Sequence, residues 1–165
     1  MSPRDLVLTP RGLRVSGRDL PCTIGRGGLV DADAKAEGDG ATPRGIHRVT
    51  GLLYRADRIA RPAPWARPIG PRDLWSDDPA DPDYNRPVRA PHAFSHERLR
   101  RADRLYDLVL LTDWNADAVP GRGSAIFLHR WRRTGTPTEG CIALAPAPLR
   151  RLAARARPGT RLIVR

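Results

Sequence analysis

Two apolar runs of this chain, Ile126-Phe127-Leu128-His129 and Thr138-Glu139-Gly140-Cys141-Ile142-Ala143-Leu144, have the composition of short buried strands. His129 ends the first run, Cys141 opens the second, and an arginine-rich loop over residues 130–137 separates them. A free thiol has a pKa of about 8.5, so it is only slightly ionised at neutral pH and needs a base before it can attack a carbonyl. The pair therefore predicts a thiol nucleophile, Cys141, with His129 as its base. A cysteine followed by apolar residues is also an ordinary core residue, which is the alternative.

Gly140 adds a third element to this pair. A glycine directly before the nucleophile allows the backbone to turn sharply, and the amides of Gly140 and Cys141 can then point toward an oxyanion. Nucleophile, base and oxyanion donors together are the parts of an acyl-transfer site.

At these residues the sequence resembles a known family. His129, the loop and Thr138-Glu139-Gly140-Cys141 are similar to the catalytic signature of the L,D-transpeptidases with a YkuD-type domain, which is a histidine, a loop and then Ser/Thr-His-Gly-Cys. Thr42-Pro43-Arg44-Gly45 resembles the Thr-Pro-x-Gly turn of these domains, and residues 123–129 resemble the approach to their histidine. The similarity extends over residues 6–164, most of the chain.

The resemblance implies a cysteine acyltransferase that acts in peptidoglycan synthesis, and so in cell-wall biogenesis and cell shape. Cys141 would form a thioester with a donor stem peptide, and the amine of an acceptor stem would resolve it. If water resolved the thioester, the enzyme would be an L,D-carboxypeptidase. The backbone carbonyl of Arg130 would orient His129, carbapenem-type inhibitors would acylate Cys141, and the protein would work in the periplasm or cell envelope.

The chain departs from the family pattern beside the nucleophile. Glu139 stands where the family most often has a second histidine. A carboxylate next to a thiolate would raise the thiol pKa, so we expect the Glu139 side chain to point away from sulfur, toward Arg130, Arg132 or Arg133. The departure leaves open which acceptor, and which cross-link, the enzyme would use.

Residues expected to bind substrate come from three parts of the chain. Residues 61–91 are dense in proline, aspartate and arginine without a hydrophobic period, which predicts a long ordered loop insertion near the cleft. A solvated loop pinned by aromatic residues is the alternative for this segment, and a turn role is the alternative for Asn115. The expected substrate-binding residues are Thr138, Glu139, Trp131, Arg132, Tyr84, Asn85 and Asn115.

Composition favours a mainly β fold of the α+β class. The 165 residues suit one domain, 1–165, and 17 prolines with 15 glycines indicate many loops and short strands. The family resemblance implies a YkuD-like β-sandwich with short helices. Strands are predicted over residues 6–9, 13–15, 20–24, 46–53, 105–112 and 161–164, and a helix after Pro146.

The net charge of +11 is carried almost wholly by arginine, since Lys35 is the only lysine. Such a surface attracts polyanions, and nucleic acid is the first partner to weigh. The arginines are spread along the chain and form no nucleic-acid motif, so we do not expect nucleic acid as the main partner. A non-enzymatic arginine-rich module that binds anionic polymers remains the second alternative to the acyltransferase.

The remaining chemistry-bearing residues predict no further site. Cys22 is expected to be a small buried strand residue, because a permanent disulfide to Cys141 would abolish activity. The scattered histidines and two cysteines lack metal-ligand spacing, so neither a metal nor a cofactor is expected. No secretory signal and no apolar run long enough to span a membrane are visible, and we expect a monomer.

Overall fold

The computed structural model describes residues 5–165, and this part of the chain is mainly β. Its one helix is α1 (Pro146–Arg155). The strands, in chain order, are β1 (Leu6–Thr9), β2 (Gly12–Val15), β3 (Arg18–Leu20), β4 (Cys22–Thr23), β5 (Leu29–Val30), β6 (Thr42–Pro43), β7 (Gly45–Tyr54), β8 (Arg67–Pro68), β9 (Asp73–Ser76), β10 (Pro87–Arg89), β11 (His96–Arg98), β12 (Leu108–Thr112), β13 (Phe127–Arg130), β14 (Ile142–Leu144) and β15 (Arg161–Val164).

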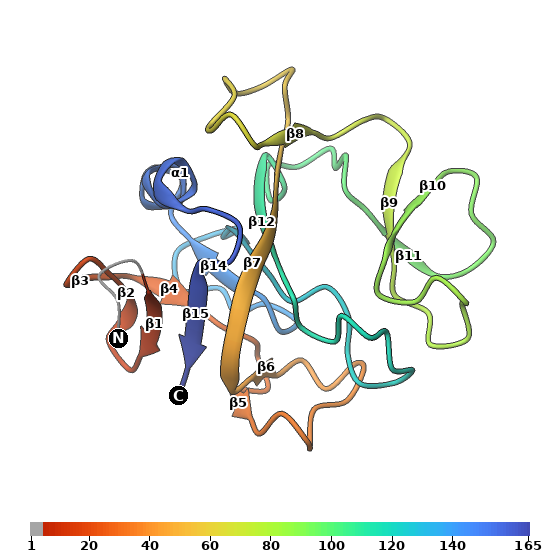
Figure 1. Ribbon diagram of the computed structural model, residues 1–165, viewed down its shortest axis with the longest axis horizontal. Coiled ribbons are helices and arrows are strands. Elements are labelled where there is room, and N and C mark those ends of the chain that lie inside the picture. The colour runs from red at the N-terminus through yellow and green to blue at the C-terminus, as the bar shows by residue number, and fades with distance from the viewer. Residues whose placement is uncertain (1–4) are drawn as a thin grey trace.

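One long strand, β7, organises the main sheet (Figure 1). Its first residues pair with β15, and its last residues pair with β12. The order of the sheet is β3-β2-β1-β15-β7-β12-β13-β14-β4, with β8 also paired to β7. Because β7 belongs to both halves, the sheet curves into a sandwich that approaches a barrel.

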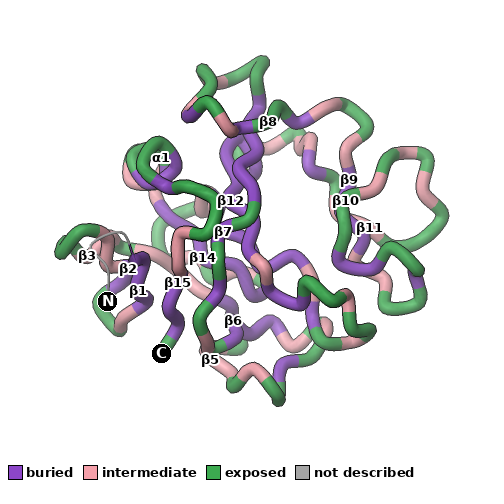
Figure 2. Tube along the Cα trace, in the orientation of Figure 1, coloured by how far each residue is buried: buried purple, intermediate pink, exposed green. Residues whose placement is uncertain are grey.

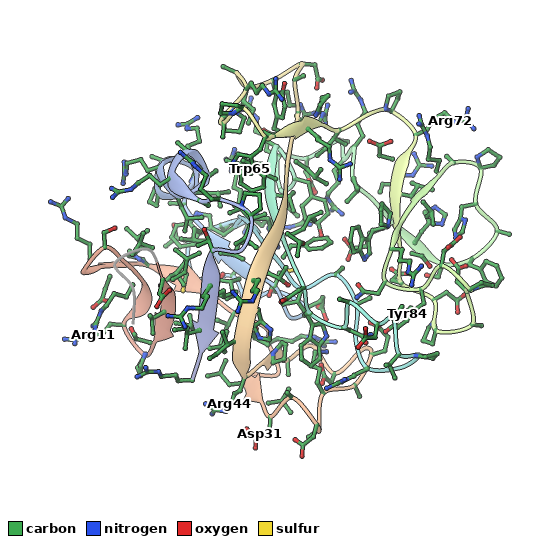
Figure 3. All side chains as sticks on the ribbon, in the orientation of Figure 1. Arg11, Asp31, Arg44, Trp65, Arg72 and Tyr84 are labelled. Carbon is green, nitrogen blue, oxygen red and sulfur yellow. The ribbon has the colours of Figure 1, made fainter. Side chains whose placement is uncertain are left out.

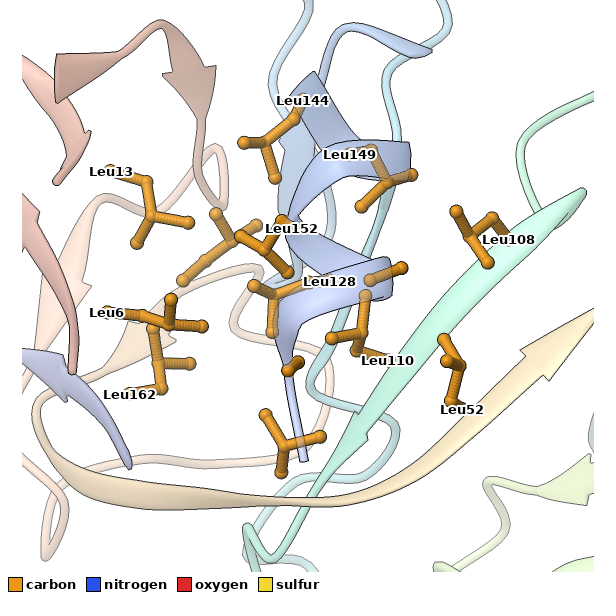
Figure 4. Packing of buried hydrophobic residues seen from close by; sticks show 14 of the residues in the cluster. Leu6, Leu13, Leu52, Leu108, Leu110, Leu128, Leu144, Leu149, Leu152 and Leu162 are labelled. Carbon is orange, nitrogen blue, oxygen red and sulfur yellow. The ribbon is translucent and has the colours of Figure 1, made fainter. Parts of the chain in front are cut away.

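A core rich in leucine fills the inside of this curved sheet. Leucines from both halves meet there, and the buried side of α1 lies against them (Figure 4). Pro146 lies in the first turn of α1, where a missing N–H costs nothing. Alternation along β12 and β13 sends one set of side chains into this core and the next set to the opposite face of the sheet. Leu110 and Leu128 point inward, whereas Val109 and Phe127 belong to a second core.

The second core is covered by residues from the predicted insertion. Within residues 61–91 the chain forms β8, β9 and β10, and β9 pairs with both β10 and β11 in a small three-stranded sheet (Figure 1). Trp75 of β9 packs edge-on against Phe127, with ring centroids 5.0 Å apart. The predicted insertion therefore contains short strands that the sequence did not indicate. Short strands separated by proline and aspartate carry too few residues for a hydrophobic period to show.

Most other elements lie where the sequence predicted them. The β1–β2 hairpin, β7, α1 and β15 are present, whereas the run from Leu20 to Ile24 is divided at Pro21 into β3 and β4. Proline lacks the N–H that a sheet ladder needs, which explains the break. The predicted strand over residues 105–112 begins only at Leu108.

Burial follows the strands that carry both cores. The buried segments run along β7, β12 and β14, whereas the connecting loops are largely exposed (Figure 2). Arg11, Arg44 and Arg72 project from different sides of the molecule (Figure 3). No helix within residues 5–165 has the length and apolar character that a membrane crossing requires.

Candidate active site

The pairing of β13 with β14 brings His129 and Cys141 to one face of the sheet. The two strands are parallel, with Leu128 opposite Ile142 and His129 opposite Ala143. One step back along both strands, the same register sets Phe127 opposite Cys141. Side chains two positions apart share a face, so His129 and Cys141 are diagonal neighbours on adjacent strands, on the face of the second core. The small side chain of Ala143 leaves room beside the imidazole.

The turn before Cys141 is fixed by the Thr-Pro-x-Gly segment. Thr42 is fully buried; its hydroxyl donates to the carbonyl oxygen of Gly140 at 2.7 Å and accepts from the amide of Gly25 at 2.9 Å. Gly140 has a φ of +136°, and a Cβ there would lie 3.0 Å from the carbonyl oxygen of Ala41. Both the backbone conformation and the close approach require glycine directly before the nucleophile.

The thiol of Cys141 is buried and protonated. Only 9% of the residue is exposed, Sγ lies 3.0 Å from the carbonyl oxygen of Ala125, to which it donates, and the amide of Phe127 donates to sulfur at 3.4 Å. Burial, and next the negative charge of Glu97, raise the pKa of the Cys141 thiol to about 12. At neutral pH the resting nucleophile is therefore a thiol and not a thiolate.

His129 is held as a neutral imidazole with a defined tautomer. Its Nδ1 lies 2.7 Å from the carbonyl oxygen of Arg130, which can only accept, so Nδ1 carries the proton. Burial lowers the pKa of His129 to about 4. The edge of the Tyr106 ring packs against the imidazole, with centroids 5.2 Å apart. The unprotonated nitrogen is then Nε2, the atom that a general base needs.

A cavity of about 320 Å3 gives access to both groups. Trp131, Arg132, Thr138 and Glu139, four of the residues expected to bind substrate, are on its wall. The complete lining consists of Glu97, Arg101, Leu105, Tyr106, His129, Trp131, Arg132, Thr136, Pro137, Thr138, Glu139 and Cys141.

The backbone and the side chain of Arg130 lie in two different cavities' surroundings: the backbone is beside His129, and the residue also lines a second cavity. Its carbonyl oxygen holds His129, whereas its side chain lines a separate cavity of about 610 Å3 beside α1. No histidine, cysteine or serine lines that larger cavity. We place the chemistry in the smaller cavity, because only it contains a nucleophile and a base.

Glu139 points away from the sulfur, but toward a different arginine from those expected. Its carboxylate lies 2.7 Å from Nε of Arg26, and both side chains are largely exposed. The chain at Gly25 bridges to Thr138, and the Arg26 amide donates to the Thr138 carbonyl oxygen at 2.8 Å. This long-range contact brings Arg26 beside Glu139. The prediction that Glu139 would point toward Arg130, Arg132 or Arg133 was therefore wrong.

The Gly140 amide, expected to hold an oxyanion, is occupied in the resting structure. It donates to Oγ1 of Thr138 at 3.2 Å, and the Thr138 hydroxyl in turn donates to the Cys141 carbonyl oxygen at 2.6 Å. Thr138 therefore closes the nucleophile turn. To bind an oxyanion, the Gly140 amide has to exchange this long hydrogen bond for one to substrate.

Tyr84, Asn85 and Asn115, which were predicted to bind substrate, are not among the residues that line this cavity, and their side chains bind other parts of the chain. Asn85 accepts from Nε1 of Trp75 and from the Ala125 amide, each at 3.0 Å. Asn115 binds backbone groups of its own turn, and the Tyr84 hydroxyl donates to Glu37. Figure 3 shows Tyr84 beside the small sheet, in the lower right. Asn85 nonetheless supports the site, because it binds the residue whose carbonyl accepts from the Cys141 thiol.

Sequence reasoning missed six of the twelve cavity residues, and three of these six, Glu97, Arg101 and Tyr106, are charged or aromatic. Tyr106 precedes β12, Glu97 lies in β11, and Arg101 follows it. The Tyr106 hydroxyl donates to Oε2 of Glu97 at 2.5 Å, and the Arg101 guanidinium lies over the Tyr106 ring at 5.3 Å. The pairing of β11 with β9 brings Glu97 near Cys141, and no local sequence signal marks that pairing.

The second cysteine, Cys22, lies apart from the cavity that holds Cys141. Cys22 lies in β4, half-buried, with a free thiol whose pKa burial raises to about 11. Within residues 5–165 no group of three histidine, cysteine or acidic side chains is arranged to hold a metal ion.

Comparison with known proteins agrees with this geometry. The family description "YkuD: L,D-transpeptidase catalytic domain" matches residues 4–164. Searches of curated proteins and of solved structures returned no match. The family match covers nearly the whole chain, and the chain therefore belongs to the YkuD family of L,D-transpeptidase catalytic domains.

Proposed function

We propose that this protein is a peptidoglycan L,D-transpeptidase that cross-links stem peptides through a thioester on Cys141. The observation that carries the proposal is the shared cavity of Cys141 and His129, together with the hydrogen bond that leaves Nε2 of His129 unprotonated. The family match supports the class of reaction, and the geometry supports the roles proposed for Cys141 and His129.

Acylation begins from a neutral pair. Because the Cys141 thiol is protonated and the His129 imidazole is neutral, the proton moves from sulfur to Nε2 as sulfur attacks the donor carbonyl. The carbonyl of Arg130 stabilises the resulting imidazolium through Nδ1. His129 then returns the proton to the leaving amine of the terminal D-amino acid, and the thioester remains.

The donor is held by cationic side chains on the cavity wall. Arg101 and Arg132 both line the cavity, and guanidinium groups bind carboxylates through paired hydrogen bonds. Stem peptides carry several carboxylates, which these arginines would orient. Both arginines also contact Asp103, so their charge is partly compensated before substrate arrives.

The thioester is resolved by the amine of a second stem. The substrate places the reaction at the cell envelope, and a carbapenem would acylate the same thiol because its strained carbonyl takes the place of the donor. If water resolved the thioester, the protein would be an L,D-carboxypeptidase. Its product would be a shortened stem and not a cross-linked dimer.

Product analysis tests the proposal. Purified protein is incubated with disaccharide-tetrapeptide, and the products are identified by mass spectrometry, with Cys141→Ala and Cys22→Ala in parallel. We expect a cross-linked dimer from the wild type and from Cys22→Ala, and none from Cys141→Ala. A shortened stem alone would assign a carboxypeptidase. Absence of both products would refute the acyl-transfer function.

A further inference from the structure

A second carboxylate in the catalytic cavity, Glu97, has no role in the acylation described above. Its position is set by β11: Glu97 is paired with Trp75 of β9, and paired residues send their side chains to the same face. Trp75 packs against Phe127 on the main sheet, so Glu97 points toward that sheet and reaches the cavity that holds Cys141 and His129.

Glu97 differs from the other cavity carboxylate in having no cationic partner. Glu139 is paired with Arg26 at 2.7 Å, whereas Glu97 makes no ion pair with any residue among 5–165. Its Oε2 accepts from the Tyr106 hydroxyl, which fixes the carboxylate without neutralising it. Arg101 lines the same cavity but forms its ion pair with Asp103, so it offsets the Glu97 charge only in part. A half-buried, partly compensated negative charge beside a nucleophile is costly, and a cation that binds there relieves the cost.

The surroundings of Glu97 favour a cation further. Burial, and after it the nearby charge of Asp77, raise the pKa of the Glu97 carboxyl. Oδ1 of Asp77 is itself buried and has no hydrogen-bond partner within the described chain. A raised pKa makes the Glu97 carboxylate a stronger base, so proton transfer to it from an ammonium is less unfavourable.

We infer that Glu97 forms the acceptor subsite, where it binds the ammonium group of the incoming amine and takes its proton before the amine attacks the thioester. This inference rests on the proposed function and specifies how its second half works. It makes Glu97 a catalytic residue for deacylation by amines and not for acylation.

The step balances as follows. The acceptor ammonium gives one proton to the Glu97 carboxylate and becomes a free amine. Its nitrogen attacks the thioester carbon, and Nε2 of His129 removes the second proton as the C–N bond forms. The C–S bond then breaks, the imidazolium protonates the Cys141 thiolate, and Glu97 releases its proton to solvent.

Partition of the acyl-enzyme tests this role in Glu97→Gln. Glutamine keeps the shape and can still accept from Tyr106, so the fold is preserved. Glu37→Gln is the matched control, because Glu37 also accepts from a tyrosine hydroxyl but does not line the cavity. Disaccharide-tetrapeptide is the donor, and the acceptors are a second tetrapeptide, ethylamine, which is an ammonium at neutral pH, and 2,2,2-trifluoroethylamine, which is neutral there.

We expect Glu97→Gln to form the acyl-enzyme no more slowly than the wild type, because loss of the Glu97 charge removes one cause of the raised Cys141 pKa. Transfer to tetrapeptide and ethylamine should fall about 100-fold. Transfer to trifluoroethylamine and hydrolysis should be unchanged, because neither requires removal of an ammonium proton. An unchanged ratio of ethylamine to trifluoroethylamine products, or a parallel fall in acylation, would overturn the role. If the wild type only hydrolyses its donor, the acceptor subsite is refuted while the acyl-enzyme stands. If it forms no acyl-enzyme, the proposed function fails and the subsite fails with it.

Discussion

Replacing His129 with glutamine is expected to make the stability of the protein less sensitive to acid. Burial lowers the pKa of His129 from 6.5 to about 4 in the folded protein. The unfolded chain therefore binds the proton first as the pH falls below about 6.5, and the unfolded state gains stability that the folded state does not. The penalty is nearly absent above about pH 7, is largely developed at pH 4 and reaches its limit below that pH.

The size of the effect follows from the shift. A tenfold change in proton affinity corresponds to about 1.4 kcal/mol. Because burial lowers the His129 pKa from 6.5 to about 4, and the folded histidine is half protonated at pH 4, the free energy of unfolding falls by about 3 kcal/mol between pH 7 and pH 4. For a domain of marginal stability this is a large fraction of the total. A glutamine does not titrate and avoids the penalty.

Urea unfolding of the wild type and His129→Gln at a series of pH values measures this directly. The free energy of unfolding of the wild type minus that of the variant should fall by about 3 kcal/mol from pH 7 to pH 4, because the carboxylates common to both proteins cancel. Cys141→Ala should keep the wild-type slope, since a thiol with a pKa of about 12 does not titrate in this range. A difference that stays constant with pH would refute the buried neutral imidazole.

Three further outcomes follow from the site and its support. Phe127→Ala removes a fully buried ring that Trp75 and Tyr106 contact, and urea unfolding should show a loss of about 3–5 kcal/mol; a loss below about 1 kcal/mol would contradict that packing. Asn85→Ala leaves buried groups of Trp75 and Ala125 unpaired and should cost about 2–4 kcal/mol by the same assay; a cost below about 0.5 kcal/mol would contradict these contacts. In the Cys22→Ala background, the rate of Cys141 alkylation by iodoacetamide should rise with pH up to about pH 10 without a plateau, because burial raises the thiol pKa to about 12; a plateau near neutral pH would reveal a thiolate pair instead.

The features that could be predicted from sequence are those encoded by neighbours in the chain. The apolar runs around His129 and Cys141 identified two strands, the glycine before Cys141 identified the turn, and the resemblance identified the carbonyl of Arg130 as the partner of His129. The proline after β14 marked the start of α1.

The features that were missed depend on contacts between distant segments. Glu97 reaches the cavity only through the three-stranded sheet, and Arg26 meets Glu139 only because the chain near Gly25 bridges to Thr138. Tyrosine and asparagine occur in many binding sites, but here the Tyr84 hydroxyl donates to Glu37 and the Asn85 amide donates to backbone carbonyl oxygens of another loop. Residue type alone does not distinguish these two uses.

The central claim is that Cys141 is the nucleophile of an acyl-transfer site, and the most direct measurement is the mass of the protein after exposure to a carbapenem. Intact-mass spectrometry should show one added carbapenem, and peptide mapping should place it on Cys141, with no adduct on Cys141→Ala and an unchanged adduct on Cys22→Ala. No adduct on the wild type, or an adduct on Cys22, would contradict the account.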